Sequence, residues 1–312
     1  MASAEKIRQL EANIDSVFLG KPKAVREVIV TLLSHGHLLI EDVPGIGKTL
    51  LGIALSRSID ASFKRIQFTN DLLPSDILGV STYSQGQERF TFNQGPIFSN
   101  IVLADEINRS TPKTQSALLE AMHDLQVTVE GVTHKLPSPF MVIATQNPIE
   151  YHGTFPLPEA QLDRFFMRVR IGYPEMEHEK QIVKESDLYS RAASLSPVLK
   201  HEEIVALQKE VDGVRVDESI LEYIIRLADA TRNDPYIKLG VSPRGALFLN
   251  RAAQAHALVE GRDYVTPDDV RATVLPVYSH RIVVESNLYG LAKIEESERV
   301  VEEVIKRTEV PL

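Results

Sequence analysis

The sequence predicts an α/β protein with a mostly parallel sheet, followed by an all-α domain. Short apolar segments bounded by turn residues alternate with helical patterns in the first half of the chain, as in proteins built from βαβ units. Beyond Tyr173–Pro174 the chain contains almost no strand patterns and several helix start signals. Since 312 residues also exceed the usual size of one domain, we expect a first domain over residues 1–173 and a second over residues 174–312.

Four short apolar segments are the predicted strands of the sheet. They are residues 37–41 (HLLIE), 64–69 (KRIQFT), 101–105 (IVLAD) and 140–145 (FMVIAT). Continuous apolar character is typical of strands that are buried on both faces of a parallel sheet. Helical patterns at Thr49–Ile59 and Pro112–His123 lie between these segments and complete the βαβ alternation.

Two further segments of the first domain predict β-hairpins. Residues 76–98 alternate around Gln85–Gly86, and residues 126–136 alternate around Glu130–Gly131. Two alternating runs on either side of a glycine-containing turn are typical of an antiparallel ribbon. We expect both ribbons to be insertions in the βαβ alternation.

The second domain is predicted to be a helical bundle because its helix starts are marked. Asp217 precedes an amphipathic stretch, Ser242 precedes Pro243, and Thr266 precedes Pro267 with Asp269 three residues beyond it. Ser, Thr and Asp are favoured N-caps, and proline is favoured at the first helical position.

Composition excludes several classes of function. The chain has no cysteine, which removes disulfides, thiolate metal sites and cysteine nucleophiles. A net charge of −9, with no tryptophan and 6% aromatic residues, opposes a nucleic-acid-binding surface. No run approaches the ~18 apolar residues of a membrane span, and the N-terminal residues MASAEKIRQLEANID lack the apolar core of a signal peptide. We therefore expect a cytoplasmic protein with no membrane partner.

Residues 39–51 (LIEDVPGIGKTLL) resemble a phosphate-binding loop with one departure from the pattern G-x-x-x-x-G-K-[ST]. Gly47 is the second glycine, but Asp42 stands where the first would be. Such a loop works because main-chain N–H groups converge on phosphate oxygens at the start of a helix. Gly45 and Gly47 are the positions where the backbone must approach phosphate, so a turn-tolerant residue can suffice at the strand exit.

The rest of the loop completes a predicted triphosphate site. Lys48 supplies a positive charge for the β- and γ-phosphates, and Thr49 supplies a hydroxyl for Mg²⁺. The residues expected to bind ATP here are Pro44, Gly45, Ile46, Gly47, Lys48, Thr49 and Leu50. For the loop taken alone, a glycine-rich turn without a ligand stays open as an alternative.

Polar residues also end two other predicted strands. Asp105 and Glu106 follow the strand 101–105, and such carboxylates lie beside the loop when the two strands are neighbours in a parallel sheet. Asp105 would hold Mg²⁺ through water, and Glu106 would orient and deprotonate the attacking water. Asn147 ends the strand 140–145, where its amide could hydrogen-bond that water or the γ-phosphate; a turn-forming Asn before Pro148 is the structural alternative. This order of motifs is that of an AAA+ ATPase.

Four segments make the chain resemble the MoxR family of AAA+ ATPases. They are EDVPGIGKT, ADEINRSTPKTQSALLEAMHDLQVTVEG, ATQNPIEYHGTFPLPEAQLDRF and SPRGAL. The resemblance runs from about Val17 to about Pro276 and implies a P-loop AAA+ core followed by a helical lid domain. Family members often carry an acidic residue at the place of Asp42.

The resemblance implies a role for each matching residue. Lys48 and Thr49 correspond to the Walker A pair, Asp105 and Glu106 to the Walker B pair, and Asn147 to sensor 1. Arg164 corresponds to the arginine finger, with Arg168 and Arg170 as competing candidates, and Arg244 corresponds to sensor 2. The segment VFLGK resembles the loop on the adenine side, where Phe18 and Leu19 would supply apolar contacts and Gly20 a close backbone approach.

The function implied by the resemblance is Mg²⁺-dependent ATP hydrolysis by a homo-oligomer, with a hexameric ring expected. Its action would be that of a chaperone-like remodeller or maturation factor for a client protein, possible clients including proteins with a von Willebrand factor A domain. Two alternatives stay open. One is a nucleic-acid motor or chelatase-like subunit, and the other is a nucleotide-gated scaffold with little turnover.

Overall fold

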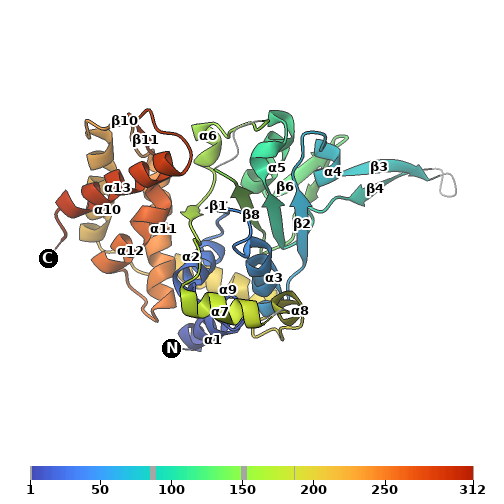
Figure 1. The fold of residues 1–312 in the computed structure, drawn as a ribbon, viewed down its shortest axis with the longest axis horizontal. Helices are drawn as coiled ribbons and strands as arrows, with labels where there is room; N and C mark the ends of the chain where they lie inside the picture. The colour runs from blue at the N-terminus through green and yellow to red at the C-terminus, as the bar shows by residue number, and fades with distance from the viewer. Residues whose placement is uncertain (1, 85–88, 149–152, 186, 312) are drawn as a thin grey trace.

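A parallel sheet of five strands lies at the centre of the first half of the chain in the computed structural model, which describes residues 2–84, 89–148, 153–185 and 187–311 (Figure 1). The strand order is β2-β5-β8-β1-β9, and each neighbouring pair is parallel. The strands are β1 (Leu38–Glu41), β2 (Phe63–Gln67), β5 (Ile101–Asp105), β8 (Met141–Gln146) and β9 (Met167–Val169).

Helices cover both faces of this sheet because its strands are apolar on both sides. In β1, Leu38 and Ile40 pack into one buried cluster and Leu39 into the other. The first cluster receives side chains from α1 (Ala2–Asp15), α2 (Pro22–Leu33) and α3 (Lys48–Ser58), and the second from α5 (Pro112–Asp124). The result is a three-layer α/β arrangement.

The four predicted strands are confirmed, but the sheet contains a fifth strand and a different neighbour relation. Strand β9 pairs with β1 from Leu38↔Met167 onward and was not predicted. The expectation that the strand ending at Asp105 lies next to the loop strand is wrong, because β8 pairs with both β1 and β5 and lies between them. The carboxyl ends of all three strands nevertheless meet at one edge of the sheet.

Both predicted hairpins are confirmed. Strands β3 (Gly79–Ser84) and β4 (Arg89–Gln94) pair antiparallel and extend far from the sheet, while Gln85–Gly86 lies outside the described residues (Figure 1). Strands β6 (Gln126–Val129) and β7 (Val132–Lys135) pair around Glu130 and Gly131, which both have positive φ. Positive φ at both central residues is the geometry of a two-residue hairpin turn. Short helices α4 (Pro74–Leu78), η1 (Ile107–Arg109) and α6 (Glu159–Leu162) connect the remaining segments.

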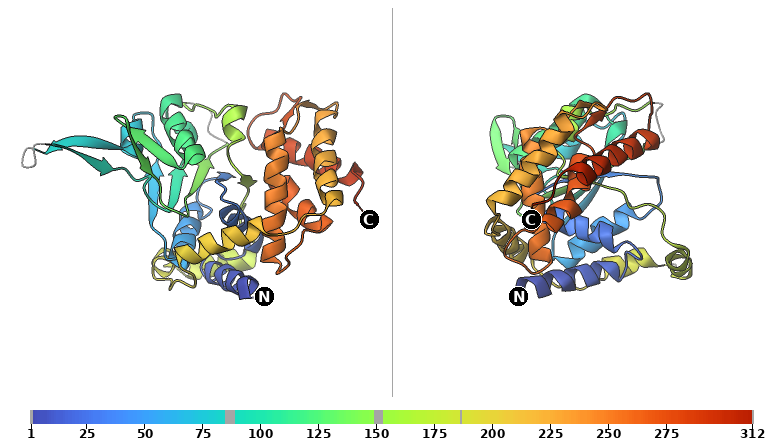
Figure 2. Two further views of the ribbon diagram at one scale, coloured as in Figure 1. Left: turned by 180° about the vertical axis from the view of Figure 1, so that it is seen from behind. Right: turned by 90° about the vertical axis from the view of Figure 1, so that its left-hand side faces the viewer.

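The chain after residue 175 is almost entirely helical. It contains α7 (Met176–Lys184), α8 (Leu188–Ala193), α9 (His201–Asp212), α10 (Glu218–Arg232), α11 (Pro243–Val259), α12 (Pro267–Tyr278) and α13 (Leu291–Arg307), with two very short strands, β10 (Ile237–Leu239) and β11 (Val283–Val284). Helix α8 contacts α3 and α9 contacts α2, whereas α10 to α13 contact one another as a bundle. The bundle and the β3–β4 hairpin lie at opposite ends of the molecule (Figures 1 and 2). The domain division at residue 173 stays a prediction.

The predicted helix starts of the bundle are the observed N-caps. Asp217 Oδ1 accepts a hydrogen bond from the Ser219 main-chain N–H, and Ser242 caps α11. At the start of α12, Thr266 and Asp269 form a capping box. Asp269 is fully buried and also accepts hydrogen bonds from Arg262 and His256, so its pKa lies well below the usual range although burial alone would raise it.

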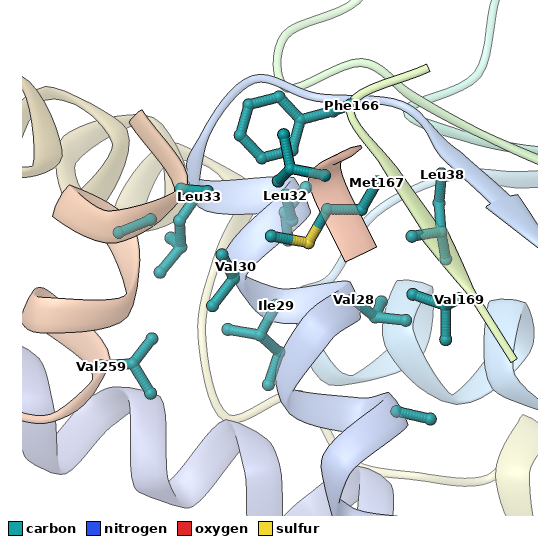
Figure 3. Close-up of a cluster of buried hydrophobic side chains, with 14 of the residues drawn as sticks. Val28, Ile29, Val30, Leu32, Leu33, Leu38, Phe166, Met167, Val169 and Val259 are labelled. Carbon is teal, nitrogen blue, oxygen red and sulfur yellow. The ribbon is translucent and has the colours of Figure 1, made fainter. Parts of the chain in front are cut away.

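Helix α2 packs between the sheet and the bundle. Leu32 of α2 lies close to Met167 of β9, while Ile29 points to the side of the helix where Val259 of α11 lies (Figure 3). These side chains are almost completely buried. Strands of the sheet and helices of the bundle therefore share one apolar core.

Candidate active site

The predicted phosphate loop connects β1 to α3 at the carboxyl edge of the sheet. Gly45 and Gly47 have φ of 84° and 90°, a left-handed conformation that glycine adopts without steric cost. A side chain at Gly47 would also approach the Phe18 ring to 3.2 Å. Because α3 begins at Lys48, its unpaired main-chain N–H groups and the positive end of its dipole face the loop, as a phosphate site requires.

Lys48 lies among acidic groups at this edge. Its Nζ donates a hydrogen bond to the main-chain oxygen of Asp42 at 2.6 Å. Burial lowers the pKa of Lys48, and the carboxylates of Asp42, Asp105 and Glu106 oppose this effect through their charge. The predicted Walker A lysine and Walker B acids are therefore close enough to interact, although β8 separates their strands.

Asp105 and Glu106 are positioned by a threonine on the intervening strand. The buried hydroxyl of Thr145 donates to Asp105 Oδ1 at 2.6 Å and accepts from the main-chain N–H of Glu106 at 2.9 Å. Glu106 has φ of 57°, which ends β5 and turns its side chain away from the strand axis. Sequence reasoning missed Thr145, since only the strand order reveals that it lies beside Asp105.

Two polar side chains of β2 also contact the acid pair and were missed. Arg65 forms a salt bridge with Asp105, with 2.6 Å between Nη2 and Oδ2, and Gln67 Nε2 donates to Glu106 Oε2 at 2.6 Å. Arg109 contacts the same carboxylate oxygen, with 3.2 Å between its Nε and Glu106 Oε2. The i, i+2 spacing of Arg65 and Gln67 puts both on one face of a strand, which is the signal that could have found them.

The residues at this edge fit a magnesium-bound triphosphate. Thr49 and Asp105 offer oxygen donors, the ligands that Mg²⁺ prefers, and both side chains are half-buried. In the described part of the chain no group of three or more His, Asp or Glu side chains could hold a metal by itself. Mg²⁺ typically uses one or two carboxylates and completes its shell with phosphate oxygens and water.

A cavity of about 320 Å³ adjoins the phosphate loop. Its wall includes Phe18, Leu19, Gly47 and Leu50, together with residues between Ile171 and Tyr189. Phe18 is buried, and Gly20 has φ of 75° with the His178 ring so close that a side chain at residue 20 would collide with it. The predicted adenine-side residues thus lie beside the loop, in apolar surroundings suited to a nucleobase.

Asn147 lies at the end of β8, next to the exit of the loop strand. The Asp42 main-chain N–H donates to the Gln146 oxygen at 3.3 Å, and Asn147 is buried. Asn147 also lines a cavity of about 570 Å³ between the sheet edge and helix α13. Its amide is therefore near the predicted phosphate site and next to the bundle.

Arg164 and Arg244 lie at the opposite edge of the sheet from the phosphate loop. Arg164 lies shortly before β9. The main-chain N–H of Phe166, the residue just before β9, donates to the main-chain oxygen of His37, the residue just before β1. The four residues of β1 span about 13 Å between this edge and the loop. Arg164 and the exposed Arg244 both line a cavity of about 420 Å³ there.

The competing finger candidates have acidic partners in their own chain. Arg168 pairs with Glu41 at 3.1 Å, and Arg170 pairs with Glu298 at 3.1 Å. Arg164 instead donates to the Leu119 main-chain oxygen at 2.8 Å, with no acidic partner among the residues that the structure describes. Among the described residues, Arg164 is therefore the one of the three arginines whose charge is not paired with a carboxylate.

Comparisons with family models match both parts of the chain. Residues 37–167 match the ATPase family associated with various cellular activities (AAA), and residues 229–305 match an AAA lid domain. The fold is that of a P-loop AAA+ core with a helical lid. No helix within the described ranges has the length and apolar character needed to cross a membrane.

Individual relatives extend over nearly the whole chain. "Uncharacterized protein YeaC" of Bacillus subtilis is 49% identical, covering 96% of this chain and 93% of its own. "Chaperone MoxR1" of Mycobacterium tuberculosis is 40% identical, covering 96% and 80%. A crystal structure from Cytophaga hutchinsonii, described as that of a candidate ATPase, is 35% identical with a TM-score of 0.90, covering 100% of this chain and 96% of that one. With these motifs, this fold and these relatives, the chain belongs to the MoxR family of AAA+ ATPases.

Proposed function

We propose that this protein hydrolyses ATP as a Mg²⁺-dependent homo-oligomer and uses the cycle to remodel or mature a client protein. The observation that supports the proposal is that the predicted catalytic residues lie at the two opposite ends of the strands of the sheet. Lys48 and the acid pair Asp105–Glu106 gather at the carboxyl edge, while Arg164 and Arg244 share a cavity at the amino edge.

The residues at the carboxyl edge supply most parts of a phosphoryl-transfer site. Main-chain N–H groups from Gly45 to Thr49 would grip the phosphates, with Lys48 beside them. Bound Mg²⁺, held by Thr49 and by Asp105 through water, would neutralise charge on the phosphate oxygens. Glu106 would accept the proton of the attacking water, and Asn147 would orient that water. Gln67 and Arg109 would hold the Glu106 carboxylate in place.

A second subunit would complete the site. A guanidinium at the amino edge lies too far from its own phosphate loop to neutralise charge there, but it can reach the loop of a neighbour in a head-to-tail assembly. Arg164 would act as the arginine finger and Arg244 as sensor 2, both across the interface. Head-to-tail contacts whose rotation closes form a ring, and six subunits is the number that the resemblance implies.

The proposed client is a protein rather than a nucleic acid. The name of the Mycobacterium tuberculosis relative supports a chaperone role, and the net charge of −9 opposes nucleic acid. The hairpins β3–β4 and β6–β7 would contact the client, and a protein with a von Willebrand factor A domain is the class implied by the resemblance. The two hairpins contact each other through the stacked rings of Phe92 and His134, whose centroids are 4.1 Å apart. This contact would let the hairpins move together.

The test of this proposal is the dependence of turnover on protein concentration. We expect ATP hydrolysis per subunit to fall steeply on dilution, as light scattering reports dissociation into single chains, because each site needs a neighbour's arginines. Turnover that stays constant in verified monomers would contradict the shared site. Salt-sensitive stimulation by DNA would favour a nucleic-acid motor instead.

A further inference from the structure

The carboxylate of Asp42 is held by three main-chain N–H groups, one from the phosphate loop and two from the segment after β9. Its Oδ1 accepts from Val43 at 2.8 Å, and its Oδ2 accepts from Ile171 at 2.8 Å and from Gly172 at 2.6 Å. The residue is 4% exposed. Three N–H partners stabilise the charge of a buried carboxylate locally.

The two partners beyond the loop belong to the wall of the cavity next to it. Ile171, Gly172 and Tyr173 line this cavity of about 320 Å³, opposite the loop residues Gly45 to Leu50. Gly172 has φ of 64°, and Lys21 Nζ donates to the Tyr173 main-chain oxygen at 2.7 Å. The wall is therefore fixed at two points, by Asp42 from the phosphate side and by Lys21 from the segment that carries Phe18.

A glycine at position 42 could not make this connection. It would satisfy the usual loop pattern, but the N–H groups of Ile171 and Gly172 would lose their acceptor, and Ile171 is buried. Unpaired buried N–H groups are costly, so the wall would shift toward water or a new partner. Lys48 would keep the main-chain oxygen of residue 42 as its acceptor, since that atom does not depend on the side chain.

We propose that Asp42 is a positioning residue that fixes the nucleobase cavity relative to the phosphate loop, and so sets the affinity for the adenosine part of the nucleotide. The inference rests on the proposed ATP site. It separates two parts of one ligand: Asp42 contributes to binding of the base and little to binding of the phosphates.

The experiment compares ATP with inorganic triphosphate, each with Mg²⁺, as ligands in calorimetry. For Asp42→Gly we expect ATP affinity to fall by about tenfold or more, the effect of a 1.4 kcal/mol change, while triphosphate affinity stays near that of the wild type. The ATP affinity of Asp42→Asn should lie between those of the wild type and Asp42→Gly. Its single amide oxygen can accept hydrogen bonds from only some of the three N–H groups.

Glu41→Gln is the matched control, because it removes a neighbouring charge that pairs with Arg168 rather than with the cavity wall. Its ratio of ATP to triphosphate affinity should equal that of the wild type. An equal loss of affinity for ATP and for triphosphate in Asp42→Asn, with an unchanged circular dichroism spectrum, would contradict the inference. An unchanged ratio of the two affinities in Asp42→Gly would also contradict it. If the wild type itself fails to bind ATP, the proposed function fails rather than this role of Asp42.

Discussion

Replacing Glu106 with glutamine should leave Mg²⁺–ATP binding close to the wild-type affinity and lower turnover by about 10²- to 10⁴-fold. Glutamine keeps the shape of the side chain and can still accept a hydrogen bond from Gln67, but it cannot take a proton from water. Steady-state hydrolysis and equilibrium binding of a fluorescent ATP analogue, measured on the same preparation, separate the two effects.

The control for this substitution is Glu222→Gln, an exposed acid on α10 far from the phosphate loop. It removes the same charge and should change neither binding nor turnover. Wild-type turnover in Glu106→Gln would show that another group activates water. Loss of binding in that variant would instead place Glu106 among the ligands that hold the nucleotide.

Arg164→Ala should lower turnover by about 10³-fold or more while each subunit still binds nucleotide, because an arginine finger acts on the charge of the transition state. The sharper result concerns mixtures. Arg164→Ala subunits keep their phosphate loop and Glu106, and Glu106→Gln subunits keep Arg164. In mixed oligomers about one interface in four would then combine an intact site with an intact finger, and turnover should reappear.

Arg226→Ala is the matched control, since Arg226 is exposed on α10 and lies in no predicted site. Mixing it with Glu106→Gln should give only the turnover expected from dilution of its own sites. An absence of rescue with Arg164→Ala, in oligomers shown by native mass spectrometry to be mixed, would remove Arg164 from its proposed role.

Most secondary structure was predictable because its signals are local. The turn at Glu130–Gly131, the cap at Ser242 before Pro243 and the apolar strand 101–105 each depend on a few adjacent residues, and the structure confirms them. The family motifs carried the rest of the prediction, since they fix the order of loop, acid pair and Asn147 along the chain.

What sequence reasoning missed depends on distant pairing. Strand β9 is short and has Arg168 between two buried apolar residues, and the buried Arg168 pairs with Glu41 from another strand. Gln67 lies 39 residues before Glu106, and Asp42 lies 129 residues before its partner Ile171. Residue type at one position cannot show such contacts. Asp42 therefore looked like a tolerated deviation from the loop pattern, although its carboxylate joins two segments of the site.

The central claim is that the loop from Val43 to Thr49 binds a magnesium-bound triphosphate, and calorimetry with Mg²⁺–ATP tests it most directly. For the wild type we predict a heat of association with about one nucleotide per chain. Lys48→Ala should bind Mg²⁺–ATP with much lower affinity, because it lacks the positive charge beside the phosphates. No heat with the wild type at saturating Mg²⁺–ATP, or equal binding by the wild type and Lys48→Ala, would contradict the account.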